Sequence, residues 1–173
     1  MLTLVLGGQR SGKSRYAESL MPADGRQVTY IATAIANDDA MRERIRAHRE
    51  QRPGHWRTVE CQGDLAGDLA ANDASDARQL VDCLTLWLTG LIDDKAGARR
   101  GIDRLVDTLP RLKGSVVLVS NETGLGVVPM DAISRRFVDL AGRMNQDVAA
   151  VCRRVVFTAA GLPLHLKGDP NAR

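Results

Sequence analysis

One short segment constrains what this chain can fold into more than any other. Residues 7–14 have the sequence Gly-Gly-Gln-Arg-Ser-Gly-Lys-Ser, which fits the pattern G-x-x-x-x-G-K-S/T. The apolar run 2–6 before it predicts a buried strand, and residues 15–20 after it predict the start of a helix. Glycines let successive backbone N–H groups face inward in such a turn, and the helix end adds partial positive charge. The pattern therefore predicts a phosphate-binding loop.

Two side chains of this loop have predicted roles. Lys13 is expected to reach the β- and γ-phosphates of a nucleotide, and the Ser14 hydroxyl is expected to bind Mg²⁺. An ordinary glycine-rich turn is the alternative, but it does not explain a strand, a Lys-Ser pair and a helix together. The predicted loop consists of Gly7, Gly8, Gln9, Arg10, Ser11, Gly12, Lys13 and Ser14.

Composition limits the class of protein. A chain of 173 residues that is 44% hydrophobic can bury one substantial core, so we expect a single domain over residues 1–168 and a C-terminal tail over 169–173. The three cysteines have no C-x-x-C spacing, which argues against a disulfide framework or a zinc site and fits the cytoplasm. No apolar stretch approaches the roughly twenty residues that span a bilayer, so no membrane span is expected. The net charge of +3 comes mostly from arginine, which a nucleotide is enough to explain without nucleic acid.

Strand and helix patterns alternate along the chain. This alternation predicts a three-layer α/β fold with a mostly parallel sheet. We expect further strands at 27–33, 79–84, 115–120 and 154–159, a short extended segment at 55–60, a final edge segment at 161–167, and helices at 37–51, 85–91, 102–112 and 132–153. Residues 65–77 are expected to form a surface helix and loop.

The carboxyl ends of the predicted strands carry the remaining candidates. Ligands of open parallel sheets lie at this edge, which favours Thr33 and Ala34 as nucleotide contacts. Asp82 is the single carboxylate on an otherwise apolar strand, the pattern of a Walker-B segment that faces Mg²⁺. The polar loop 121–129 follows another buried strand, and such loops carry function more often than packing. Trp87 is expected to lie in the core.

The predicted helix 37–51 is rich in arginine. Its cations either surround an anion or form an ordinary solvated surface, and the pattern leaves both interpretations open. The residues concerned are Arg42, Arg44, Arg46, Arg49 and Arg52.

Several segments resemble one family, the bifunctional adenosylcobinamide kinase/adenosylcobinamide-phosphate guanylyltransferases of cobalamin biosynthesis. The resemblance covers nearly the whole chain, and its Arg-Pro-x-x-Trp and Asn-Glu-x-Gly-x-Gly-x-Val-Pro segments are more specific than the phosphate loop. Gln9 departs from the family, where a smaller residue is expected. The segments are 7–15, 30–34, 44–48, 52–60, 81–85, 121–129, 137–146 and 161–164.

This resemblance implies a RecA-like P-loop NTPase fold and two reactions. The first transfers a γ-phosphoryl group from ATP or GTP to adenosylcobinamide, with Mg²⁺; the second transfers GMP from GTP to the product and releases pyrophosphate. It also implies a homotrimer, a corrinoid substrate and a histidine that carries GMP as a phosphoramidate, at the position of His48. The nucleotide contacts it adds to the loop are Ala32, Thr33, Ala34, Arg49, Glu50, Gln51, Arg52, Glu60 and Asp82.

Other interpretations stay open. A neutral imidazole is an available nucleophile, but a histidine on an arginine-rich helix is often only an exposed polar residue, and His55 is a competing candidate. The chain could be a small-molecule kinase alone, similar to shikimate or nucleoside kinases, or a RecA-like ATP switch acting on nucleic acid or a partner protein. The absence of an Asn-Lys-x-Asp motif disfavours a GTPase switch.

Overall fold

The described part of the chain is built on one mostly parallel sheet. The structure is a computed structural model, and it describes residues 1–22, 26–34, 39, 42–43, 46 and 53–168. Seven strands lie in the order β3-β2-β4-β5-β1-β6-β7, and β7 alone runs antiparallel to its neighbour. The strands are β1 (Leu2–Gly7), β2 (Thr29–Ala32), β3 (Arg57–Glu60), β4 (Arg78–Asp82), β5 (Ser115–Asn121), β6 (Arg154–Ala159) and β7 (Leu162–Lys167).

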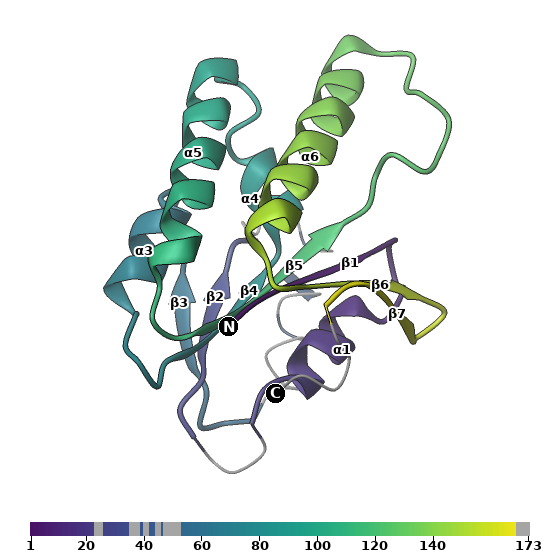
Figure 1. Cartoon of the computed structure of the whole chain (residues 1–173). Helices are drawn as coiled ribbons and strands as arrows, with labels where there is room; N and C mark the ends of the chain where they lie inside the picture. Colours follow the sequence, from purple (N-terminus) through teal and green to yellow (C-terminus); the bar gives the residue numbers. More distant parts are fainter. Residues whose placement is uncertain (23–25, 35–38, 40–41, 44–45, 47–52, 169–173) are drawn as a thin grey trace.

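Helices cover both faces of the sheet. Figure 1 shows α3, α4, α5 and α6 on one face and α1 on the other. This arrangement confirms the predicted three-layer α/β fold. The helices are α1 (Lys13–Ser19), α3 (Leu65–Ala71), α4 (Leu84–Thr89), α5 (Lys95–Thr108) with a 3₁₀ turn at Leu109–Arg111, and α6 (Ala132–Val151). None of the helices that the structure describes is both long and apolar enough to cross a membrane.

The apolar core divides into two clusters, one on each face of the sheet. Successive side chains of a strand point to opposite faces, so Leu4 of β1 packs with Ile102 and Met144 while Val5 packs with Ala17 and Met21. A sheet that is covered on both sides favours apolar residues on both faces of its central strands. This is why residues 4–6 of β1 and 116–119 of β5 are uninterrupted apolar runs rather than alternating ones.

Three sequence predictions need correction. The predicted helix 102–112 begins earlier, at Lys95, because Asp94 accepts a hydrogen bond from the Gly97 N–H and caps it. The predicted strand 79–84 ends at Asp82, since Cys83 is already the N-cap of α4. The segment 65–77 was expected at the surface, but the inner face of α3 is part of the core.

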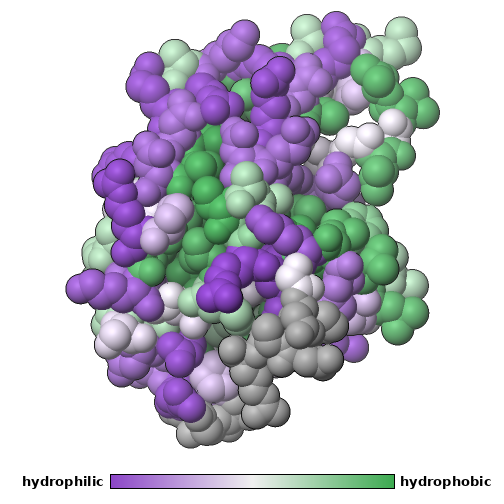
Figure 2. Space-filling view, in the orientation of Figure 1, coloured by the Kyte–Doolittle hydropathy of each residue, from purple (hydrophilic) through white to green (hydrophobic). Residues whose placement is uncertain are grey.

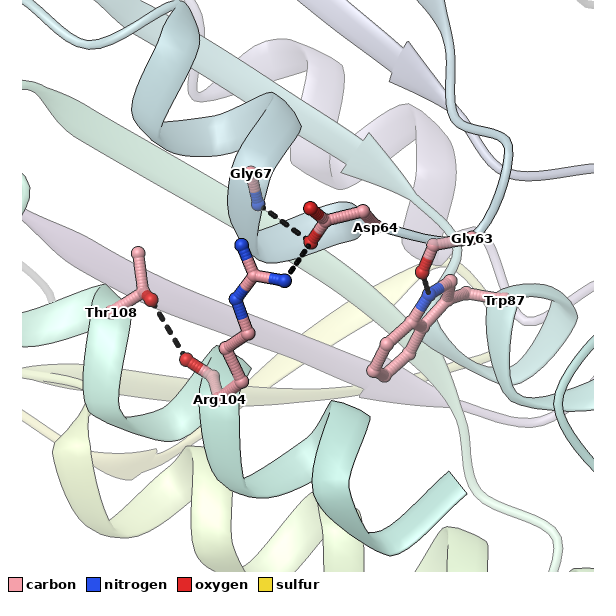
Figure 3. Close-up of polar contacts among 6 residues, drawn as sticks. All are labelled: Gly63, Asp64, Gly67, Trp87, Arg104 and Thr108. Atoms are coloured by element: carbon pink, nitrogen blue, oxygen red, sulfur yellow. Dashed lines mark hydrogen bonds and ion pairs between the residues drawn. The ribbon is translucent and has the colours of Figure 1, made fainter. Parts of the chain in front are cut away.

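Helix α3 is joined to its neighbours by polar contacts as well as by its buried face. The Asp64 carboxylate accepts the Gly67 N–H at 3.0 Å and lies 3.1 Å from the Arg104 guanidinium of α5 (Figure 3). The Trp87 indole N–H of α4 donates to the Gly63 carbonyl at 2.8 Å. Trp87 is only 4% exposed, which confirms its predicted place in the core.

Candidate active site

The predicted phosphate loop connects the central strand β1 to α1. Arg10 and Gly12 have positive φ, 57° and 92°, so the backbone turns sharply where the motif predicts it. A Cβ at Gly12 would lie 2.9 Å from the Gly161 Cα, and one at Gly7 would lie 2.4 Å from the Ser11 Oγ. Both positions therefore require glycine for steric reasons, in addition to the left-handed conformation at Gly12. Gln9, the departure from the family, is exposed.

The loop is braced from a distant part of the chain. The hydroxyls of Ser11 and Thr158 are 3.1 Å apart, and Thr158 also donates to the Leu6 carbonyl at 3.0 Å. The Gly161 N–H donates to the Ser11 carbonyl at 2.9 Å. Thr158 was not predicted as a site residue, and its one sequence signal is a polar residue within the apolar strand β6. The turn between β6 and β7 thus fixes the shape of the loop.

Lys13 lies inside the curve of this loop. It is only 5% exposed, and its Nζ donates to the Gly8 carbonyl at 3.1 Å. Ser14 follows on the first turn of α1 and is half-buried. An ammonium group in this position suits the phosphate-binding role predicted for Lys13.

Asp82 ends β4, two strands from β1. Its carboxylate accepts the Tyr30 hydroxyl at 3.1 Å, while its carbonyl accepts the Thr33 N–H at 3.3 Å. The strand register places Ala32 beside Asp82, so the predicted residues at the end of β2 lie next to the predicted metal ligand. Tyr30 was missed by the sequence analysis, because nothing in the pattern shows that it faces Asp82.

The oxygen atoms of Ser14 and Asp82 fit a magnesium ion better than a softer metal. Mg²⁺ prefers oxygen ligands and is usually held by one or two protein groups together with phosphate oxygens and water. In the described residues, no three His, Cys, Asp or Glu side chains gather as a ready-made metal cage. The oxygen chemistry of these two predicted ligands is compatible with Mg²⁺.

A buried polar network lies beneath the end of β5. The Asn121 amide donates to the Thr85 hydroxyl at 2.7 Å, and Asn145 of α6 donates to the Asn121 carbonyl at 3.2 Å. Asn145 also accepts the Ser120 hydroxyl at 2.7 Å. Thr85 and Asn145 are almost fully buried, and their partners are distant in sequence, so no local pattern identified them. The network holds the start of the 121–129 loop in place.

Cys83 lies between Asp82 and this network. Burial raises the pKa of its thiol, and the neighbouring Asp82 carboxylate raises it further. The thiol therefore stays protonated at neutral pH, so Cys83 is a packing and hydrogen-bonding group rather than a nucleophile.

The remaining predicted residues fall into two groups. Glu60 ends β3 at the edge of the sheet, and His55 precedes that strand; both are exposed. Predictions that lie outside the described residues concern His48, Arg49, Glu50, Gln51 and Arg52.

Two arginines of the predicted helix 37–51 are described. Arg42 lies 2.6 Å from Asp39, and Arg46 lies 2.6 Å from Glu43. These side chains are exposed, which favours the solvated-surface interpretation for this pair.

Comparison with known proteins decides the family. The model of the family "Cobinamide kinase / cobinamide phosphate guanyltransferase" matches residues 3–166. The chain belongs to this family. It is therefore a member of an enzyme family named for two group transfers, as the resemblance of its motifs predicted.

Two named relatives agree with this assignment. The chain is 52% identical over 172 residues to the bifunctional adenosylcobalamin biosynthesis protein CobP of Pseudomonas aeruginosa, covering 98% of this chain and 99% of the relative. It is 41% identical over 182 residues to the bifunctional adenosylcobalamin biosynthesis protein CobU of Salmonella typhimurium, covering 96% and 100%.

Solved structures support the fold of this cobinamide kinase family member. The P4 protein of bacteriophage phi6, in complex with ADP, matches with a TM-score of 0.50 and 19% identity. The match covers 94% of this chain and 52% of the P4 chain, so this chain spans about half the length of P4. The KaiC-like protein PH0186 of Pyrococcus horikoshii matches with a TM-score of 0.51 and 12% identity, covering 90% and 69%. The fold is that of the RecA-like P-loop NTPases.

Proposed function

We propose that the protein phosphorylates adenosylcobinamide and then transfers GMP from GTP to the adenosylcobinamide phosphate. The observation that carries this proposal is the phosphate loop on β1, with Lys13 inside its curve, in a chain that matches the two-activity family over residues 3–166. The names of the relatives from Pseudomonas aeruginosa and Salmonella typhimurium support the same pair of reactions.

The kinase step would use the loop and the carboxyl edge of the sheet. Backbone N–H groups of residues 8–13 would bind the phosphates, and the Lys13 ammonium would stabilise charge on the transferred γ-phosphoryl group. Ser14 and Asp82 would hold Mg²⁺, which neutralises phosphate charge when bound. Thr33 and Ala34, beside Asp82, would contact the nucleotide, donated as either ATP or GTP. Phosphoryl transfer needs little more than positioning and charge stabilisation, which this arrangement can supply.

The guanylyl step needs a nucleophile in addition. We assign it to His48, with Arg49, Glu50, Gln51, Arg52 and Glu60 as further nucleotide contacts. The imidazole nitrogen would form a bond to the α-phosphorus of GTP as the bond to pyrophosphate breaks, and the corrinoid phosphate would then take the GMP. The motif around His48 in the family resemblance supports this role.

Labelling tests the nucleophile directly. Incubation with α-labelled GTP should give an acid-labile, base-stable protein adduct in the wild type. His48→Ala should abolish the adduct and guanylyl transfer yet retain phosphorylation of adenosylcobinamide, because the kinase step does not pass through the histidine. His55→Ala is the matched control and should keep the adduct. An undiminished adduct on folded His48→Ala protein would remove this assignment.

Two alternatives predict different results. A small-molecule kinase alone would phosphorylate adenosylcobinamide but would give no GMP adduct. A nucleic-acid motor would bind a polyanion with strong salt dependence and would hydrolyse ATP faster in its presence. Corrinoid turnover without polymer stimulation would decide for the enzyme.

We also propose that the enzyme is a homotrimer. An apolar row on the edge strand β7 supports association: Leu162, Leu164 and Leu166 are 72%, 61% and 56% exposed and alternate along the strand. Leu164→Asp should shift the mass measured by light scattering toward the monomer. An unchanged mass for this variant would place the interface elsewhere.

The sheet and the thiols support two further assignments. The continuous seven-stranded sheet favours one domain over residues 1–168 with a tail at 169–173. The unpaired thiols of Cys61, Cys83 and Cys152 suit a reducing cytoplasm.

A further inference from the structure

The proposed kinase step leaves one proton without a destination. The acceptor is an alcohol, and its hydroxyl proton must leave as its oxygen bonds to phosphorus. Lys13 is a cation, Ser14 and Asp82 are assigned to the metal, and His48 is assigned to the GMP step. A general base is therefore still to be found near the phosphate loop.

The strand order selects one carboxylate for this role. In the described part of the chain, Glu60, Asp82 and Glu122 end or follow parallel strands at the carboxyl edge of the sheet. Neighbouring strands are about 4.8 Å apart, so β3 lies about 19 Å, β4 about 10 Å and β5 about 5 Å from β1. Glu60 is too far from the loop, and Glu122 is the closest of the three in the plane of the sheet.

The backbone of Glu122 is fixed directly against the phosphate loop. Its N–H donates to the Gly7 carbonyl at 3.1 Å, at the first residue of the motif. The preceding residue, Asn121, is held from below by Thr85 and Asn145, as described above. A catalytic base must be positioned before the reaction, and these contacts from β1, α4 and α6 provide that positioning.

The Glu122 side chain is half-buried. Its Oε1 accepts the Gly124 N–H at 2.8 Å, and no cation forms an ion pair with it among the residues that the structure describes. A carboxylate that is not neutralised by a salt bridge can accept a proton.

The loop beyond Glu122 stands away from the sheet on the way to α6 (Figure 1). Its side chains are apolar and exposed, up to 96% at Val127 and 94% at Met130, and Figure 2 shows apolar side chains gathered at this end of the molecule. Glu122 therefore lies where this exposed loop begins. A large acceptor could present its hydroxyl group there to the phosphate loop while the rest of the acceptor stays outside the phosphate loop.

We propose that Glu122 is the general base of the kinase step, an inference that rests on the proposed function. The acceptor oxygen forms a bond to the γ-phosphorus while the bond from that phosphorus to the β-phosphate oxygen breaks. The nucleoside diphosphate leaves with the bonding electron pair, and the hydroxyl proton passes to the Glu122 carboxylate and later to solvent.

A structural role for Glu122 would be to shape the turn through the Gly124 N–H, and two variants separate this role from base catalysis. Glu122→Gln keeps an oxygen that accepts this hydrogen bond but cannot take a proton, whereas Glu122→Ala loses both functions. If Glu122 is the base, both variants should lower kcat for adenosylcobinamide phosphorylation by about 10²- to 10⁴-fold. If it only shapes the turn, Glu122→Gln should restore kcat.

The experiment measures phosphorylation of adenosylcobinamide and, in parallel, the GMP adduct from α-labelled GTP. Glu122→Gln should lose phosphorylation, keep the KM for ATP and keep the adduct, with circular dichroism confirming the fold. Asp139→Asn, an exposed carboxylate on α6, is the matched control and should retain both activities.

Different failures have different meanings. Wild-type phosphorylation by Glu122→Gln would overturn this inference and leave the proposed function standing. An equal loss of phosphorylation and of the GMP adduct would also overturn it, because that result indicates a distorted loop. A wild-type enzyme that forms the adduct but does not phosphorylate adenosylcobinamide would overturn the proposed kinase step and this inference with it.

Discussion

Lys13 is a buried cation within the predicted phosphate loop. Removing an ammonium group from water is costly unless it has hydrogen-bond partners or an opposite charge. The Gly8 carbonyl provides one partner in this structure, and nucleotide phosphates would provide the charge. We therefore expect a bound phosphate to stabilise this buried ammonium group.

Replacement of Lys13 tests this arrangement. We expect Lys13→Ala to lower kcat for adenosylcobinamide phosphorylation by about 10²- to 10³-fold, because one preorganised charge on the transition state is lost. The far-ultraviolet circular dichroism spectrum should stay unchanged, since no apolar core contact is removed. Turnover at the wild-type level would contradict the predicted role.

Glycine 12 offers a steric test of the same loop. Gly12→Ala should destabilise the protein by about 1–3 kcal/mol, because it combines a left-handed φ with a backbone contact at 2.9 Å. Gly8→Ala is the matched control, since no atom lies within 4 Å of the added Cβ there. Urea unfolding without nucleotide measures both. Equal stability of the two variants would show that the turn tolerates a side chain at residue 12.

At the scale of elements, helix α6 depends on its N-cap residue, Asp131. The Asp131 carboxylate accepts the Ser134 N–H at 2.7 Å, which satisfies a backbone group that the helix itself leaves unpaired. This hydrogen bond holds the pKa of Asp131 below its ordinary value of 3.8. Helix α6 also carries Asn145, so its stability bears on the position of the loop after β5.

The lowered pKa gives a pH-dependent prediction. A depressed pKa in the folded state means that the stabilisation is present above about pH 3.8 and is lost as pH falls through the folded pKa. Asp131→Ala should therefore be less stable than the wild type at pH 7, and the difference should shrink toward pH 3. Urea unfolding at both pH values checks this. Asp131→Asn keeps an acceptor oxygen, so its free energy of unfolding at pH 7 should lie between those of the wild type and Asp131→Ala. A stability difference that does not change with pH would argue against an ionised cap.

At the scale of the whole molecule, all three thiols lie in the interior. Burial raises the pKa of Cys61, with a further contribution from the Asp68 carboxylate, and burial also raises the pKa of Cys152, each to about 12. Because the pKa of each thiol is higher in the folded than in the unfolded state, the neutral buried thiols contribute fully to the free energy of unfolding below pH 9.0. That contribution is lost as the pH rises toward 12.

Thiol chemistry tests this burial. At pH 8 a disulfide reagent such as Ellman's should modify none of the three cysteines in the folded protein and all three in denaturant. The urea midpoint of the wild type should fall between pH 9 and 11, and it should fall less for Cys152→Ala. Rapid modification of the folded protein would show that the interior opens readily.

The sequence predicted the layers of the molecule but not the order of its strands. Alternating strand and helix patterns specify a three-layer fold, and the loop motif identifies β1, yet no local pattern shows that β1 lies between β5 and β6. Helix α5 was placed too late because its first two turns are polar and contain Gly97 and Gly101. The tertiary contacts that stabilise these two turns of α5 are seen only in the folded structure.

The candidate site, like the fold, could be predicted from the sequence only in part. Motifs predicted Lys13 and Asp82, because their chemistry is tied to a fixed local spacing. Thr158 and Asn145 escaped prediction because each meets its partner across a large sequence separation. The placement of His48 at the site stays a prediction from the family resemblance.

The central position of β1 has a consequence for how the chain folds during its translation on the ribosome. This strand is made early, yet it pairs with residues 116–121 and 154–158, and its loop is braced by Thr158 and Gly161. Since a chain emerges from the ribosome in order, the nascent β1 has no neighbours on either side until most of the protein has been synthesised. A ribosome stalled before residue 154 should display a chain without nucleotide affinity, and the affinity should arise in a single late step of translation.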